Sequence, residues 1–277
     1  MHPRTSIQFL GLATCLVGSQ LRAADFTMSH KNASAQINIT NANAGVVSWT
    51  VDGVNNLNYQ GLYYRVGNVG PEATVQSISS SPSVSFTQVP NVLSLLDVTY
   101  ATASYSVRTL FQLTGSTSGS GIANLSETIT VKNLSGSALD FHLFQYSDFD
   151  LGGLVGGQTA QYFFDALGQP YKVSQTDGIR TVTETVNANT APIGHFAAAL
   201  GNTTLTSLMD GGSTTLNDVA NAGSGNANFA YEWDVLLDPN ETLTISKLMT
   251  IVPEPTVGSF ILAVLAAGKL ASRRKQS

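Results

Sequence analysis

The segment Tyr105-Ser-Val-Arg-Thr-Leu-Phe-Gln-Leu113 carries the pattern that decides the fold. Every second side chain is tyrosine, valine, threonine, phenylalanine or leucine, and Arg108 and Gln112 fall between them. Such alternation is typical of a strand with one buried face and one solvated face. The sequence therefore predicts a β-strand here, in a sheet that packs through one face.

Similar period-two patterns, separated by turn residues, extend in both directions from this segment. The strand after it, Ala138–Tyr146, is apolar on both faces, which favours a central position in its sheet. Asp52-Gly53 after Val46–Val51 is typical of a hairpin turn. The other predicted strands are Ala35–Thr40, Leu57–Val66, Thr74–Ser79, Val84–Val89, Leu125–Asn133, Thr159–Phe164, Tyr171–Ser174, Gly178–Val186 and His195–Leu200.

The last part of the pattern contains one interruption. Leu205–Met209 and Ser213–Ala220 are predicted to form short helical turns, and Asn221–Asn228 a loop. A final hairpin is expected to pair Asn228–Leu237 with Glu241–Val252, with Phe229, Tyr231 and Trp233 facing the core. Together the patterns predict an all-β fold: one large antiparallel β-sandwich over residues 25–251 with a short helical insertion.

The C-terminal segment, residues 252–277, has three parts in a fixed order. Pro253-Glu254-Pro255 is followed by an apolar run, Val257–Ala267, and then by a basic end that contains Arg273, Arg274 and Lys275. Basic residues stay on the cytoplasmic side of a membrane, so the triplet is expected outside. As a helix, residues 256–268 would span only about 20 Å, which predicts a short transmembrane helix that serves as a temporary anchor.

This arrangement resembles the PEP-CTERM sorting signal of exported bacterial proteins. The resemblance covers the last residues of the chain only, and Lys269 departs from the usual apolar run. It implies an exosortase-type membrane protease as partner, a transient stay in the inner membrane, and delivery to the cell surface or the extracellular matrix. The residues that it assigns to sorting are Pro253, Glu254, Pro255, Arg273, Arg274 and Lys275.

Residues 1–24 have the build of a secretory signal peptide. Arg4 precedes an apolar stretch, Ile7–Val17, and small residues follow, with cleavage after Ser19 or after Ala24 both compatible with the sequence. The one cysteine, Cys15, lies in this segment. The mature chain is therefore expected to contain no disulfide and no thiol nucleophile.

The composition limits the classes of partner. Charged residues make up 11% of the chain and the formal net charge is −5, with no basic patch in the predicted sandwich. A nucleic-acid-binding domain needs such a patch. No nucleic-acid partner is therefore expected.

A pair of carboxylates follows the predicted central strand. Asp148 and Asp150 project from the same side and are followed by Gly152 and Gly153, which is how a calcium loop can begin. A complete loop would continue with further oxygen ligands, and here Leu154 follows instead. Calcium bound by Asp148 and Asp150 is the only cofactor that the sequence suggests. The alternative interpretation is that the two carboxylates are solvated and bind no ion.

The sequence contains no recognisable catalytic motif. Glu232 and Asp234 share one face of the final hairpin, but the separation of two carboxylates that a glycosidase needs is not visible from sequence. His142 and His195 are interpreted as a packed residue and a turn residue. No Gly-x-Ser-x-Gly segment is present. The chain is therefore predicted not to be an enzyme, with no catalytic residues.

Tyrosines offer a different function. Five of them, Tyr59, Tyr63, Tyr64, Tyr100 and Tyr105, could stack on sugars if their side chains are exposed. The leading hypothesis is an exported, non-catalytic structural or adhesive component. The alternatives are a carbohydrate-binding module for exopolysaccharide, which exposed tyrosines would favour, and a polysaccharide-active enzyme, which two carboxylates in a cleft would favour.

Overall fold

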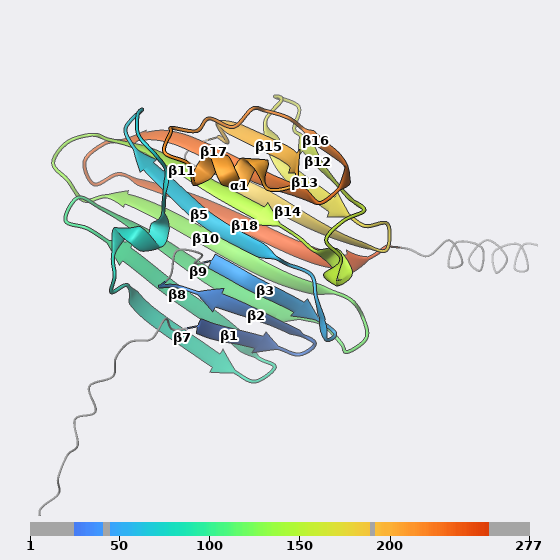
Figure 1. Ribbon diagram of the computed structural model, residues 1–277. Helices are drawn as coiled ribbons and strands as arrows, with labels where there is room; N and C mark the ends of the chain where they lie inside the picture. The colour runs from blue at the N-terminus through green and yellow to red at the C-terminus, as the bar shows by residue number, and fades with distance from the viewer. Residues whose placement is uncertain (1–24, 41–44, 189–191, 255–277) are drawn as a thin grey trace, which may run out of the picture.

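The computed structural model describes residues 25–40, 45–188 and 192–254. Within these residues the chain forms two nine-stranded antiparallel sheets that pack face to face (Figure 1). The predicted sandwich is thereby confirmed for this part of the chain. The predicted signal peptide and C-terminal helix lie outside the described residues. No helix in the described part is both long and apolar enough to cross a bilayer.

Sheet A has the order β1-β2-β3-β5-β11-β17-β15, with β4 beside β3 and β6 beside β5. The bounds of its strands are β1 Asp25–His30, β2 Ala33–Asn38, β3 Gly45–Val51, β4 Val54–Asn55, β5 Tyr59–Val66, β6 Ala73–Thr74, β11 Leu139–Asp148, β15 His195–Leu200 and β17 Ala227–Leu237. The strand that is apolar on both faces, β11, lies inside the sheet between β5 and β17, as predicted.

Sheet B has the order β16-β12-β13-β14-β18-β10-β9-β8-β7. Its strands are β7 Ser83–Val89, β8 Leu93–Ala101, β9 Tyr105–Gly115, β10 Ala123–Asn133, β12 Gln158–Phe164, β13 Pro170–Thr176, β14 Arg180–Ala188, β16 Asn221–Gly225 and β18 Thr242–Pro253. Strand β9 buries Val107, Phe111 and Leu113 and exposes Arg108, as its alternation predicts.

The core lies between the two sheets and consists mainly of aromatic and branched side chains. Trp49, Phe141 and Trp233 of sheet A are fully buried there, and the Phe149 and Phe229 rings stack with their centroids 5.9 Å apart. Because side chains of a strand alternate between faces, the residues between these core positions must point out of the sandwich. In sheet A that outer face is covered by a further segment.

The covering segment runs from residue 201 to residue 220, between β15 and β16. It contains one helix, α1 (Thr203–Leu208), which lies over sheet A (Figure 1). Leu208 and Leu216 pack onto Phe144, Tyr146 and Ala230 in a second apolar cluster, separate from the core. The segment thus turns the outer face of β11 and β17 into a buried surface.

Several local predictions are wrong. Val75–Ile78 forms a 3₁₀ helix instead of a strand, Ser213–Ala220 is irregular instead of helical, and Asn221–Gly225 is strand β16 instead of a loop. Strands β17 and β18 form no hairpin: β17 pairs with β11 and β15, whereas β18 pairs with β10 and β14. The Asp238-Pro239-Asn240 turn therefore carries the chain from one sheet to the other.

Candidate active site

The register of four strands arranges the outer face of sheet A in rows. One row joins Tyr63 on β5, Phe144 on β11, Glu232 on β17 and His195 on β15. The next row places His142 between Arg65 and Asp234. Residues from four distant parts of the sequence thereby meet on one surface. The surface therefore brings together ionisable side chains from several strands, among them Arg65, His142, Glu232 and Asp234.

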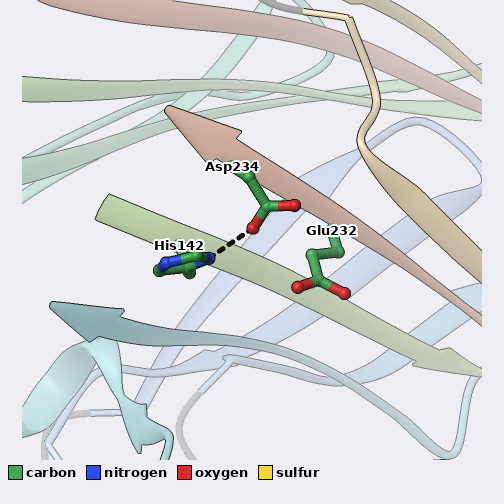
Figure 2. Close-up of side chains that lie close together, drawn as sticks. All are labelled: His142, Glu232 and Asp234. Carbon is green, nitrogen blue, oxygen red and sulfur yellow. Dashed lines mark hydrogen bonds and ion pairs between the residues drawn. The ribbon is translucent and has the colours of Figure 1, made fainter. Parts of the chain in front are cut away.

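His142, Glu232 and Asp234 form the centre of this surface. The Nδ1 atom of His142 is hydrogen-bonded to Oδ1 of Asp234 on the neighbouring strand (Figure 2). Each of the three offers one ligand atom, and these atoms lie within 4.8 Å of one another. Imidazole nitrogen and carboxylate oxygen are both atoms that can bind zinc. Here, however, the imidazole and one carboxylate are already bonded to each other.

Glu232 is the buried carboxyl group of the cluster. Its side chain is 1% exposed. The pKa of Glu232 is raised to about 7, chiefly by burial and also by the neighbouring Asp234 carboxylate, while a hydrogen bond from the Leu216 N–H partly opposes the shift. A carboxyl group with such a pKa is present in both protonation states at neutral pH. It can therefore both donate and accept a proton during a reaction.

The covering segment is fixed to the sheet by hydrogen bonds to charged groups. The Leu216 N–H donates to Oε2 of Glu232 at 2.7 Å. The Thr214 N–H donates to Oε1 of Glu72 at 2.9 Å, and the Thr214 carbonyl accepts from Nη1 of Arg65 at 3.0 Å. Arg65 and Glu72 form a buried ion pair with each other. This pair holds both polar backbone groups of Thr214 in place.

The site reaches solvent on the side of Asp234 and His195. Their side chains are 33% and 36% exposed. Gly194 lies directly against Asp234: a Cβ atom at this position would be 2.7 Å from Oδ2 of Asp234. The His195 ring donates from Nδ1 to Oδ2 of Asp218 at 2.9 Å, and this hydrogen bond raises the pKa of His195. The cluster is therefore open to solvent at Asp234 and closed at Glu232.

The five tyrosines that sequence analysis singled out divide into two groups. Tyr64 and Tyr105 pack against Phe141 in the core, and Tyr100 is buried with its hydroxyl donating to the Ile39 carbonyl at 2.9 Å. Tyr59 and Tyr63 lie on the outer face of sheet A, beside α1. Tyr63 is 2% exposed, so of these two only Tyr59 is partly open to solvent.

Asp148 and Asp150 lie at the end of β11 and just beyond it. Oδ2 of Asp148 accepts a hydrogen bond from the Asn58 side chain at 2.9 Å, and the Asp148 side chain is buried. The two carboxylates belong to no group of three or more potential metal ligands among the described residues. Calcium binding there stays a prediction.

The predicted sorting motif lies only in part within the described residues. Pro253 is the last residue of β18 and pairs with Arg180, and the Glu254 carboxylate accepts a hydrogen bond from the Thr181 hydroxyl. Pro255, Arg273, Arg274 and Lys275 lie outside the described residues. The first two residues of the triplet are therefore held against sheet B.

Sequence reasoning identified the Glu232 and Asp234 pair but missed its partners. His142 was interpreted as a packed residue, and Arg65 and Glu72 were not considered. The available signal was the outward position of His142 in β11, which alternates with Phe141 and Leu143. That signal becomes informative only with the register that places His142 opposite Asp234.

No family model and no curated protein matches the sequence. Solved structures do match. A bacterial glucoamylase complexed with acarbose aligns with a TM-score of 0.54 and 10% identity over 89% of this chain, and this chain spans about a third (36%) of the glucoamylase. A galactose 1-epimerase from Lactobacillus acidophilus aligns with a TM-score of 0.53 and 9% identity, covering 83% of this chain and 95% of the epimerase.

A galactose mutarotase-like protein from Clostridium acetobutylicum gives a TM-score of 0.52 at 10% identity, with 82% and 95% of the two chains covered. The sandwich therefore has a fold found in carbohydrate-active enzymes. The prediction that the chain is not an enzyme is contradicted by these matches. The carbohydrate alternatives agree with them better than a purely structural or adhesive component does.

Proposed function

We propose that this protein is a carbohydrate-active enzyme that transfers protons at the anomeric centre of an aldose, with its active site at His142, Glu232 and Asp234. The observation that carries the proposal is the buried Glu232 carboxyl, with its pKa near 7, beside a second carboxylate and an imidazole. The likeness of the fold to a galactose 1-epimerase supports a sugar as the substrate.

The reaction needs two proton transfers and no other reactant. A base removes the proton from the hydroxyl on the anomeric carbon, an acid protonates the ring oxygen, and the bond between this carbon and the ring oxygen breaks. Rotation of the open aldehyde and the reverse transfers close the ring as the other anomer. Asp234, held by His142 and open to solvent, is placed to contact the sugar, and Glu232 behind it can supply or take up a proton.

Two carboxylates could also serve a glycosidase, as the polysaccharide-active alternative requires. Glycosidases place their carboxyl groups on opposite sides of the scissile bond, about 5 Å or more apart. Glu232 and Asp234 instead project side by side from the same face of one strand. This arrangement favours proton exchange between them over an attack from two sides.

The test is the rate at which a freshly dissolved α-aldose reaches anomeric equilibrium, followed by polarimetry or by proton NMR. Glucose, galactose and xylose are the first substrates. The protein is expected to accelerate equilibration, and Glu232→Gln to slow it by about 100-fold or more, the usual contribution of a general acid or base. Glu241→Gln, at the exposed turn before β18, is the matched control. Equal rates for wild type and Glu232→Gln would refute the assignment.

Export also remains a proposal. It rests on the sequence of the two ends of the chain, with residues 1–24 as signal peptide and residues 252–277 as sorting signal. On this proposal the enzyme acts outside the cytoplasm, at the cell surface or in the extracellular matrix. Exopolysaccharide is then the sugar source nearest to it.

A further inference from the structure

One flank of the sandwich ends in strand β7 (Figure 1). Among the described residues β7 pairs with β8 alone, so no strand lies against the backbone groups on its other side. An edge of this kind can pair with a strand from another chain. Most proteins prevent such pairing with charged side chains, bulges, prolines or a covering segment.

Strand β7 has few of these protections. Its sequence, Ser83-Val-Ser-Phe-Thr-Gln-Val89, contains no charged residue, and the whole segment from residue 73 to residue 96 is uncharged. Its register with β8 continues through all seven residues without a bulge. Pro82 and Pro90 lie just outside the strand, so every residue of β7 keeps its backbone N–H. The edge is therefore open to pairing over its full length.

The neighbouring edge of sheet A, strand β1, is protected by side chains. Oε1 of Gln88 accepts a hydrogen bond from the Ser29 N–H at 3.1 Å, and Nε2 of Gln88 donates to the Ser29 carbonyl at 2.5 Å. Oδ1 of Asn91 accepts from the Lys31 N–H at 3.0 Å. Side chains of the β7–β8 hairpin thus occupy backbone groups of β1, and β7 is the edge on this flank that stays open.

The core-facing side chains of β7 are only partly covered. Val84 and Phe86 lie opposite Val98 and Leu96 of β8, which are buried in the core, yet Val84 and Phe86 are 37% and 38% exposed. The Phe86 ring contacts Phe26 of β1 edge to face, with the centroids 5.4 Å apart. A further strand beside β7 would bury more of this apolar surface, which is favourable.

We propose that β7 is a dimerisation edge, which pairs antiparallel with β7 of a second copy of this chain and joins the two copies of sheet B into one sheet. Two identical strands that pair antiparallel are related by a two-fold axis, the commonest symmetry of protein dimers. Phe86 is the middle residue of the strand, so an axis at Phe86 pairs the whole strand. Ser85 of each copy then lies opposite Thr87 of the other, and no like charges meet.

A second copy fits this edge better than an extended peptide from another protein does. Residues that lie opposite each other in paired strands share one face of the sheet. The second copy therefore brings its own Val84, Phe86 and Phe26 to the same side of the joined sheet. The half-open core faces of both copies then cover each other, whereas a peptide would bring a strand without the flank of a sandwich.

The experiment measures the mass of the full chain by sedimentation velocity over a range of protein concentrations. A mild detergent shields the apolar stretches at residues 7–17 and 257–267. The wild type is expected to form a dimer. Ser85→Lys combined with Thr87→Lys places a lysine of each copy opposite a lysine of the other, and should weaken the dimer by about tenfold or more.

A charge-swapped variant tests the register itself. Ser85→Lys combined with Thr87→Glu places a lysine of each copy opposite a glutamate of the other, so dimerisation should return to the wild-type level or above it. Ser85 and Thr87 are both exposed, so the monomer should fold in either variant. Thermal unfolding checks that it does.

Gln112→Lys combined with Thr114→Lys is the matched control. It adds the same charge to exposed positions of β9, an interior strand of the same sheet, and should leave the dimer intact. The inference is overturned if the wild type is a monomer at every concentration, whether or not it binds an extended peptide. It is also overturned if the double-lysine variant of β7 dimerises like the wild type, or if the lysine–glutamate variant dimerises no better than the double-lysine variant.

Discussion

His142 and Asp234 are separated by 92 residues in the chain, and their side chains are hydrogen-bonded across two neighbouring strands of sheet A. The bond fixes the orientation of the Asp234 carboxylate on the solvent side of Glu232. Neither strand alone contains this arrangement. The fold creates it by placing β17 beside β11 in one register.

The pKa of Glu232 gives a prediction for stability against pH. Its value is raised from 4.5 to about 7 in the folded protein, so the folded state binds more protons than the unfolded state between these pH values. Stability should therefore fall as pH rises from 4.5 to 7. Allowing for partial solvation, the loss is on the order of 2 kcal/mol. Urea unfolding of wild type and Glu232→Gln at pH 4.5, 6 and 8 measures it, and parallel profiles would contradict the shifted pKa.

The ion pair between Arg65 and Glu72 should stabilise the covering segment. Glu72→Gln leaves the buried Arg65 without its counter-charge, which typically costs about 3–5 kcal/mol. Faster hydrogen exchange is expected at the Thr214 and Leu216 amides. Asp97→Asn is the control, because it breaks the exposed pair of Asp97 with Arg108 and should cost about 1 kcal/mol or less. Similar losses of stability in Glu72→Gln and Asp97→Asn would contradict the stabilising role of the ion pair between Arg65 and Glu72.

Lys247 is a buried cation between the two sheets. Its Nζ lies 2.5 Å from Glu127 and 3.6 Å from Glu184, and all three side chains are buried. Burial raises the pKa of Glu184, and Lys247 opposes that rise. Lys247→Met should therefore destabilise the fold by about 3 kcal/mol or more, since it leaves two buried carboxyl groups without a cation. Adding Glu127→Gln and Glu184→Gln to the Lys247→Met variant should restore much of the lost stability, as measured by denaturant titration.

The sorting proposal predicts a defect in delivery for changes in the tail. Replacing Glu254 by alanine, or deleting Arg273 to Lys275, should leave the protein in the membrane or in the wrong compartment, as measured by cell fractionation. Thr181→Val replaces only the hydroxyl that bonds to Glu254, so it controls for loss of that contact. Normal surface delivery of both tail variants would count against the proposal.

Sequence periodicity located most strands but assigned few of their partners. The alternation in β9, β10 and β17 follows from burial of one face, which is a local property. Pairing is not local. Glu241–Val252 was expected beside Asn228–Leu237 because the two segments are consecutive in the chain. A strand with one apolar face can, however, bury that face equally well from the opposite sheet. Strand β8 was missed altogether, although Leu96, Val98 and Tyr100 alternate within it.

Only part of the candidate active site could be predicted, because strand pairing cannot be read from local periodicity. The spacing of Glu232 and Asp234 places both on one face of any strand, so this part could be predicted. His142 and Arg65 come from strands whose order in the sheet is set by packing. The raised pKa of Glu232 depends on burial under residues 201–220, a segment whose second half was predicted to be helical and is irregular.

The change of sheet at Asp238-Pro239-Asn240 has a mechanical consequence. It places the last strand, β18, inside sheet B, with β14 on one side and β10 on the other. Tension applied at Glu254 would act along this strand, in shear, against two rows of backbone hydrogen bonds at once. An edge strand pulled in the same direction would be held by one such row only. We therefore expect β18 to resist force from its C-terminal end more strongly than an edge strand would.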